Sequence, residues 1–235
     1  MGNSVWSGVA EKSVDSSEGP VLRPRGLVDL RGTGDVPAVF LYPVDAVVVV
    51  SGLPGSGKST LLRRWSKAAL AIDPRVVHVA CEAVMPVWLP YVVYRPWARW
   101  RYFRWLRTAV RGGGGPLLVH DCGGRPWMRR WLRRSAGRQG RELHLVVLDV
   151  WVAEALSGQA ARGRWAPRRV FARHRRGLDR LLRELSGLGV AQPGPAWATT
   201  PARDPVREAA SVVLLDRSSR EQVAAVEFVA AHART

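Results

Sequence analysis

Residues 46–60 read AVVVVSGLPGSGKST, a run of valines followed at once by closely spaced glycines and a lysine. The β-branched run at 47–50 is typical of a central parallel strand that is buried on both faces. Pro74 stands beyond the point where a following helix should have ended. Between the glycines and Pro74, apolar residues recur at helical spacing and predict a helix packed on the same sheet: Leu61, Leu62, Trp65, Ala69 and Ile72. The stretch therefore predicts a strand, a glycine-rich loop and a helix in direct succession.

The loop satisfies the pattern G-x-x-x-x-G-K-[ST] over residues 52–59. Glycines let the backbone wrap around an anion with successive N–H groups pointing inward, and the helix N-terminus adds partial positive charge. Lys58 is placed to reach the β- and γ-phosphates, and the Ser59 hydroxyl is placed to hold Mg²⁺. A glycine turn without a ligand would need neither residue. We therefore expect ATP and Mg²⁺ to be bound by Gly52, Leu53, Pro54, Gly55, Ser56, Gly57, Lys58, Ser59 and Thr60.

The rest of the chain alternates between short apolar runs and longer amphipathic segments. Residues 1–36 are rich in glycine, serine and charge, and we interpret them as a flexible leader, with 37–43 docking as an edge segment. Alternation of this kind predicts an α/β domain with a doubly wound parallel sheet. We expect further strands at 76–80, 117–120, 143–148 and 212–215, helices at 97–111, 127–134, 151–161, 168–186 and 219–231, and a loop at 191–205.

The chain carries a formal net charge of +17, and all of its basic residues except Lys12, Lys58 and Lys67 are arginines. Arginine clusters attract phosphates, so one interpretation is a nucleic-acid-binding face. The alternative is a compositional bias that replaced surface lysines with arginines, and the sequence leaves both open. No apolar run approaches the roughly 18 residues of a membrane-spanning helix, and the N-terminus lacks the order of a secretory signal. We expect a cytoplasmic protein with no membrane partner.

The loop GLPGSGKST at 52–60 resembles the P-loop of small kinases of the polynucleotide kinase and zeta-toxin group, whose bacterial members often carry the label AAA family ATPase. The resemblance continues at 117–121 (LLVHD) and 145–149 (LVVLD), which are similar to the third and fourth strands of that group, and it spans roughly residues 44–232. It implies a P-loop NTPase sandwich of three layers, α/β/α, in a kinase-like domain over residues 37–235. The sheet order that it implies is 2-3-1-4-5.

The resemblance also implies an arginine-bearing lid over residues 162–168. The sequences at 161–164 (ARGR) and 170–174 (VFARH) are similar to the lid arginines and the helix that follows them. Arg162 and Arg164 would close over the transferring phosphoryl group, stabilise its charge and exclude water. The alternative is that both are solvated turn arginines in a basic chain. The polar face of the next helix accounts better for Arg168, Arg169 and Arg173.

On the acceptor side, kinases of this group place an acidic residue after the second strand and an arginine three residues later. Glu82 matches the acid and is our candidate general base, with a surface or capping glutamate as the alternative. Met85 stands where the arginine is expected, which counts against a phosphorylated nucleic-acid end as acceptor. Asp121 is a candidate for catalysis and for Mg²⁺ coordination, or else a helix cap. We assign Asp149 and Asp216 to capping or turns.

Residues 86–111 form an insertion between the second and third expected strands, where acceptor specificity is often built. Tryptophans alternate with arginines along this segment, and one interpretation is an acceptor-gripping subdomain or a surface for nucleic-acid stacking. A packed amphipathic helix is the competing interpretation. Three other tryptophans occupy apolar helical positions and are predicted to be core: Trp65, Trp127 and Trp131.

The pattern favours an ATP-dependent kinase that transfers the γ-phosphoryl group to a hydroxyl acceptor, whose identity the sequence does not give. Under this hypothesis the catalytic residues are Lys58, Glu82, Asp121, Arg162 and Arg164, with Ser59 and Asp121 on Mg²⁺. Two alternatives remain open. One is a nucleotide-dependent ATPase or switch, and the other is a nucleic-acid-binding protein that retains a P-loop.

Overall fold

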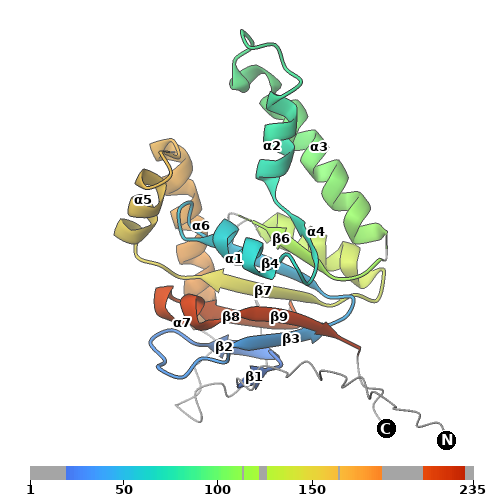
Figure 1. The fold of residues 1–235 in the computed structure, drawn as a ribbon, viewed down its shortest axis with the longest axis vertical. Coiled ribbons are helices and arrows are strands. Elements are labelled where there is room, and N and C mark those ends of the chain that lie inside the picture. Colours follow the sequence, from blue (N-terminus) through green and yellow to red (C-terminus); the bar gives the residue numbers. More distant parts are fainter. Residues whose placement is uncertain (1–19, 113, 122–125, 164, 187–208, 231–235) are drawn as a thin grey trace, which may run out of the picture.

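The main sheet has six parallel strands in the order β2-β8-β7-β4-β6-β5 (Figure 1). The computed structural model describes residues 20–112, 114–121, 126–163, 165–186 and 209–230. In sheet order, the strands span Gly26–Asp29 (β2), Ser211–Leu215 (β8), Leu143–Leu148 (β7), Val47–Gly52 (β4), Leu117–His120 (β6) and Leu70–Ile72 (β5).

Strand β4 lies at the centre of this sheet, paired with β6 on one side and β7 on the other. Each side chain from Val47 to Val50 is at most 1% exposed. Val47 and Val49 face one core, whereas Val48 and Val50 face the other. The prediction of a strand buried on both faces is therefore confirmed.

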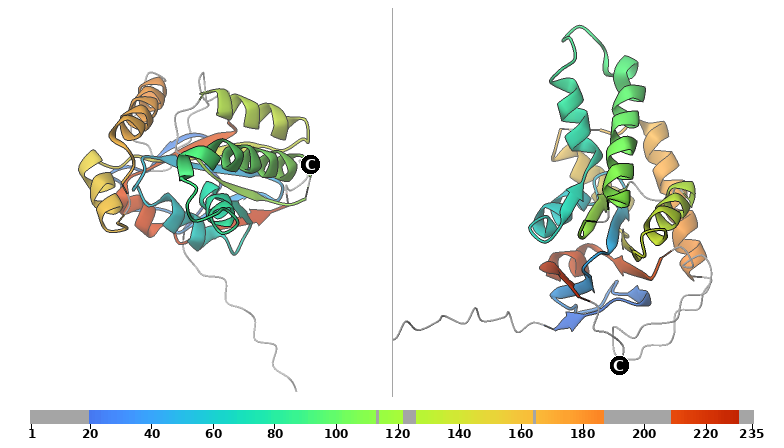
Figure 2. Two further views of the ribbon diagram at one scale, coloured as in Figure 1. Left: turned by 90° about the horizontal axis from the view of Figure 1, so that it is seen from above. Right: turned by 90° about the vertical axis from the view of Figure 1, so that its right-hand side faces the viewer.

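Helices cover one face of the sheet, and helices together with a second sheet cover the other (Figure 2). The first core is closed by helices α3 (Tyr91–Arg111), α4 (Pro126–Gly137) and α6 (Arg168–Ser186). The second core is closed by α1 (Lys58–Trp65) and by a parallel three-stranded sheet of β1 (Val21–Leu22), β3 (Val39–Pro43) and β9 (Ala225–Val229).

The strand expected at 76–80 is instead part of helix α2 (Pro74–Glu82), and the second strand of the sheet is β5. Helix α1 ends at Trp65, so Ile72 belongs to β5 and not to α1. The reason is local: the Asp73 side chain accepts a hydrogen bond from the backbone N–H of Arg75, and Pro74 occupies the first helical turn. Aspartate followed by proline is a helix start, not a sign that a helix has ended.

Two further expectations near the chain ends are wrong. Strands β1 and β2 lie within 1–36, where we expected a mostly flexible leader, and β2 extends the main sheet beside β8. Within 219–231, where we expected one helix, the chain forms the end of α7 (Arg217–Gln222) and then β9. The strands β5, β6, β4, β7 and β8 reproduce the expected sheet order 2-3-1-4-5, with β5 in place of the expected second strand. Strand β2 is an additional strand at the edge beside β8.

Helices α2 and α3 form an arm that projects above the sheet, on the same side as helix α5 (Val152–Ala160) (Figure 1). The arm corresponds to the expected insertion, although α3 begins earlier than the predicted helix at 97–111. In the part of the chain that the structure describes, no helix is long and apolar enough to cross a membrane. The loop predicted at 191–205 lies outside the described residues.

Candidate functional site

The glycine-rich loop connects β4 directly to α1, as the sequence predicts. Gly55 and Gly57 have φ angles of +93° and +89°, in the left-handed region that residues with a Cβ atom rarely adopt. Helix α1 begins at Lys58, immediately behind Gly57. The loop is therefore a tight turn that ends at a helix N-terminus, which is the geometry that binds a phosphate anion.

Lys58 is buried, with 3% of its surface exposed. Its Nζ donates hydrogen bonds to the backbone carbonyls of Gly52 at 2.9 Å and Leu53 at 2.7 Å. These contacts hold the ammonium group against the first residues of the loop. A buried lysine needs such partners, because an unpaired charge away from water is costly.

Two elements distant in sequence brace the outer side of the loop. From α5, the amide of Gln159 donates to the carbonyl of Pro54 at 3.2 Å, and Gly158 packs against Gly55 so closely that a Cβ atom would meet the Gly55 carbonyl. From α7, Nη1 of Arg220 donates to the carbonyl of Ser56 at 2.6 Å. The sequence did not point to these residues, because single contacts from helices distant in sequence follow no motif.

Asp73 is the acidic residue that follows the second strand of the sheet. Its Oδ1 lies 3.3 Å from Nδ1 of His120, which ends β6, and the side chain also caps α2. Burial would raise the pKa of Asp73, but the proximity of His120, the Arg75 N–H and the Ser59 hydroxyl together lower it below its ordinary value. Asp73 is therefore ionised at neutral pH. The Asp-Pro pair was the signal that could have located it.

Glu82 does not occupy the position expected of it. It is the last residue of α2, and it is exposed on the arm rather than at the carboxyl end of a strand. The prediction failed because it rested on a strand at 76–80 that does not exist. Met85 was compared with the arginine expected three residues after the acidic residue. Because Glu82 does not follow a strand, that comparison no longer applies. Arg75, two residues after Asp73, is the arginine that follows the actual second strand.

Asp121 follows β6 and is 8% exposed. Its backbone N–H donates to the carbonyl of Val50 at 3.0 Å, which places it beside the strand that leads into the loop. Among the described residues, no group of three or more His, Cys, Asp or Glu side chains could by itself hold a metal ion. Hydroxyl and carboxylate oxygens such as those of Ser59 and Asp121 fit Mg²⁺, which usually takes one or two protein ligands together with phosphates and water.

Arg162 comes from the turn after α5, and its Nη2 donates to the hydroxyl of Thr60 at 3.3 Å. The expected lid arginine therefore reaches the first turn of α1. Arg164 lies outside the described residues. The remaining three arginines of that region are exposed on α6, as the polar face of that helix predicts: Arg168, Arg169 and Arg173.

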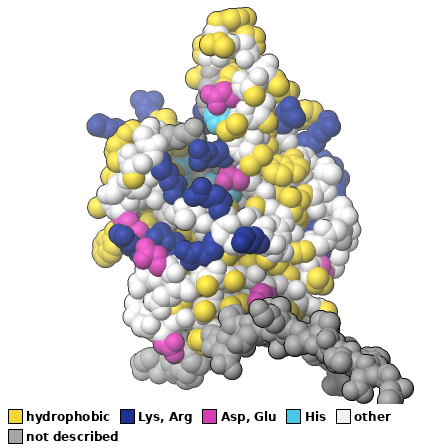
Figure 3. Space-filling view, viewed as in Figure 1, with side chains coloured by type: hydrophobic (Ala, Val, Ile, Leu, Met, Phe, Trp, Pro, Cys, Tyr) yellow, Lys and Arg dark blue, Asp and Glu magenta, His cyan; other side chains and the backbone are white. Residues whose placement is uncertain are grey.

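A cavity of about 770 Å³ opens between α1, α2 and the turn after α5. Asp73 is the one acidic side chain among its described lining residues, and Ser59 lies in the same wall. Arginines gather on this side of the molecule, around a hollow that also shows acidic and histidine side chains (Figure 3). The basic lining consists of Arg63, Arg75 and Arg162, and the apolar wall consists of Leu62, Ala71, Val76, Val79, Ala80 and Ala83.

The remaining strand-ending aspartates have structural roles. Asp216 accepts a hydrogen bond from the Ser219 N–H at 2.8 Å and caps α7, which confirms the expected role. Asp149 forms an ion pair with Arg31, 2.6 Å from its Nη1, which ties β7 to the residues after β2. Among the tryptophans predicted to be core, Trp65 is 1% exposed, whereas Trp127 is 49% exposed and that prediction is wrong.

A family model described as the viral superfamily 1 RNA helicase core domain matches residues 48–124, which is less than half of the chain. No curated protein matches the chain.

Several solved structures are similar to this chain at low identity. The tunicamycin resistance protein of Deinococcus radiodurans is 17% identical, with a TM-score of 0.41 over 59% of this chain and 80% of that one. A gluconokinase from Sinorhizobium meliloti 1021 is 18% identical, with a TM-score of 0.39 over 78% and 92%. The APS kinase of Mycobacterium tuberculosis, in complex with AMPPNP and APS, is 18% identical, with a TM-score of 0.42 over 77% and 94%. The sheet order and the loop between β4 and α1 make this a parallel-sheet α/β fold of the P-loop type.

Proposed function

We propose that this protein is a phosphotransferase that moves the γ-phosphoryl group of Mg²⁺-ATP to a hydroxyl group of an acceptor. One observation carries the proposal: the Asp73 carboxylate and the Ser59 hydroxyl of the phosphate-binding loop line the same cavity. A cavity beside the loop that contains an ionised carboxylate suits the binding of an acceptor molecule. A site that only hydrolyses ATP would need to admit no more than a water molecule.

The loop and α1 would hold the triphosphate. Backbone N–H groups of the turn and the helix N-terminus would donate to the phosphates, and Lys58 would exchange its carbonyl contacts for phosphate oxygens. Ser59 and Asp121 are the residues that would hold Mg²⁺, which neutralises charge on the β- and γ-phosphates when bound. Arg162, already in contact with the first turn of α1, would stabilise negative charge on the oxygens of the transferring group.

Asp73 would orient the acceptor hydroxyl and accept its proton. The nearby His120 and the Ser59 hydroxyl keep this carboxylate ionised, as its lowered pKa indicates. A lowered pKa makes Asp73 a weak base, which suffices where the transition state is loose and positioning dominates catalysis. Arg75 and Arg63 line the same cavity and favour an acceptor that itself carries negative charge.

An ATP-consumption assay tests this function. ADP release is measured with Mg²⁺-ATP alone and with separate pools of nucleosides, oligonucleotides, sugars and antibiotics. We expect at least one pool to stimulate ADP release and to yield a phosphorylated product that carries the γ-phosphoryl group. Turnover that no pool stimulates would contradict the kinase and favour the alternative, an ATPase or nucleotide-dependent switch.

A further inference from the structure

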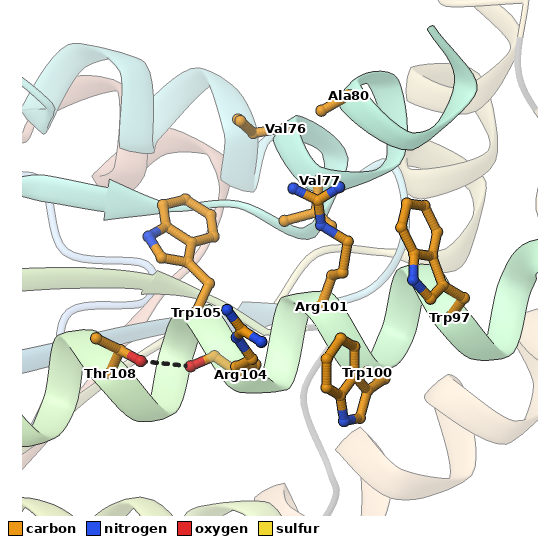
Figure 4. A pocket seen from close by; sticks show the side chains of 9 residues that line it. All are labelled: Val76, Val77, Ala80, Trp97, Trp100, Arg101, Arg104, Trp105 and Thr108. Atoms are coloured by element: carbon orange, nitrogen blue, oxygen red, sulfur yellow. Dashed lines mark hydrogen bonds between the residues drawn. The ribbon is translucent and has the colours of Figure 1, made fainter. Parts of the chain in front are cut away.

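Tryptophans and arginines interleave along α3, on the arm, with Trp100 exposed and Trp97 and Trp105 half-buried. Figure 4 shows Trp97, Arg101 and Trp105 rising from α3 toward α2, with Trp100 and Arg104 on the adjoining side of the helix. We call this surface the tryptophan–arginine face, and it consists of Trp97, Trp100, Arg101, Arg104, Trp105, Arg107 and Arg111.

Two grooves of about 620 Å³ each run along this face. The first lies between α3 and α2, and the second lies between α3 and α4. Trp100, Arg104 and Thr108 line both grooves, so the two form one continuous surface across the helix. The first groove also shares Val76 and Ala80 with the cavity that contains Asp73, which joins this surface to the candidate active site.

The aromatic rings of this face are already in stacking arrangements. The guanidinium carbon of Arg101 lies 5.0 Å from the ring centroid of Trp97, and that of Arg104 lies 5.3 Å from the ring centroid of Trp100. Trp100 is 55% exposed, so much of its ring surface faces solvent beside Arg104. Planar groups can therefore stack on these rings beside the arginines.

The charge of the face has one sign. Neither α3 nor α4 contains an aspartate or a glutamate in its sequence, and the described lining of both grooves is free of acidic side chains. Four arginines contribute to the two linings: Arg101, Arg104, Arg107 and Arg111. A ligand that matches this surface must be polyanionic and must carry flat rings.

We propose that the tryptophan–arginine face binds a single-stranded nucleic acid. Arginines would contact its phosphates while a base stacks on the exposed ring of Trp100 and neighbouring bases lie in the groove lined by the half-buried Trp97 and Trp105, which is possible only where the bases are not already stacked in a duplex. From Trp97 to Arg111 the helix rises about 21 Å, which spans about six nucleotides at a spacing of about 3.4 Å each.

A membrane surface suits this face less well. Helices that lie on membranes segregate their apolar and basic side chains onto opposite faces. On α3, Trp100 and Arg104 stand one helical turn apart on the same face and line the same grooves. The proposal does not depend on phosphoryl transfer, because binding of the nucleic acid is measured in the absence of ATP.

Fluorescence anisotropy of the full chain with a labelled oligodeoxythymidylate of about 12 nucleotides tests the proposal, within the known range of single-strand site sizes. With four phosphate contacts, the affinity is expected to fall about 50-fold between about 50 and 200 mM salt. Trp100→Ala should weaken binding about fivefold to hundredfold, whereas Trp100→Phe, which keeps a ring, should retain most of it. Arg104→Ala should reduce the magnitude of the salt slope by about 0.7.

Matched controls carry the same substitutions elsewhere. Trp151→Ala removes a tryptophan that is 85% exposed next to α5, and Arg180→Ala removes an exposed arginine of α6. Both should leave binding unchanged, and circular dichroism checks that every variant folds. The proposal is overturned by no binding, by equal affinity for a duplex, or by salt-sensitive binding that Trp100→Ala leaves intact. Tighter binding to phosphatidylserine vesicles than to the oligonucleotide would also overturn it.

Discussion

The glycine-rich loop and the proposed acceptor side of the cavity lie next to each other, yet the sequence determines them in different ways. The loop is specified locally, by β-branched residues before it and by glycines within it that accept positive φ angles. The acceptor side depends on where the second strand ends, and that strand has only three residues, Leu70–Ile72. A short strand leaves little periodicity to detect.

The difference teaches that a candidate site residue is predictable when its own motif fixes its backbone. Lys58 and Ser59 follow from one contiguous pattern. The position of Asp73 instead depends on the sheet, because β5 pairs with β6 and thereby brings Asp73 to His120, where its proposed role arises. The predictions that follow test these two regions against each other.

The largest effect is expected in the loop. Lys58→Ala should lower acceptor-dependent ADP release by about a thousandfold or more, because it removes a preorganised charge on the transferring group. The measurement is the rate of ADP release in the presence of the stimulating pool. Lys67→Ala, at an exposed lysine just beyond α1, should retain full activity. Full activity in Lys58→Ala would refute the role of that residue.

The next effect compares the two candidate bases. Asp73→Asn should lower the same rate by about a hundredfold or more, because it removes the proton acceptor and keeps the shape of the side chain. Glu82→Gln should have no effect, since Glu82 is exposed at the end of α2. The reverse result, with Glu82→Gln inactive and Asp73→Asn active, would restore the original interpretation of the sequence.

A smaller effect concerns the contact between α5 and the loop. Gly158→Ala should lower the free energy of unfolding by about 1–3 kcal/mol, because the added methyl group meets the Gly55 carbonyl. Gly137→Ala, in helix α4 with open space around it, should raise the free energy of unfolding by about 0.5–1 kcal/mol. Urea denaturation measures both. Equal changes in the two variants would show that α5 does not press against the loop.

The smallest effect lies in the sheet, away from both regions. Burial lowers the pKa of His144 below its ordinary value of about 6.5, despite the nearby Glu142, and Nδ1 of His144 lies 2.8 Å from the Ser211 hydroxyl. As the pH falls, the unfolded chain therefore binds a proton that the folded chain does not. The contribution of His144 to the free energy of unfolding is thus complete above about pH 6.5 and is lost as the pH falls below it. Urea denaturation at a series of pH values should show the free energy of unfolding decline below about pH 6.5. His144→Asn should reduce the slope of this free energy against pH. An unchanged slope in that variant would contradict the assignment.

Much of the scaffold could be predicted from the sequence. The strand at Val47–Val50 and the cap at Asp216 follow from a β-branched run and from a polar residue at a strand end, whereas the order of the strands around β4 was implied by the resemblance to the kinase group. The strand at 76–80 was wrong because Val76, Val77 and Val79 have strand propensity, yet the cap at Asp73 starts a helix there. Propensity yields to such local and tertiary constraints.

The parts of the site that could not be predicted depend on contacts between distant segments. Arg220 reaches Ser56 from a helix far along the chain, and Gln159 reaches Pro54 from α5. Neither residue is marked by spacing or by composition. Trp127 was placed in the core from helical spacing alone, but α4 turns that side chain outward beside the second groove of the tryptophan–arginine face.

Isothermal titration calorimetry with Mg²⁺ and an unhydrolysable ATP analogue tests the central claim most directly. The turn between β4 and α1 should give saturable heat with one site per chain, and Lys58→Ala should abolish or strongly weaken it. Absence of heat with the unmodified chain, together with no thermal protection by ATP or GTP, would contradict the claim that this turn holds a triphosphate.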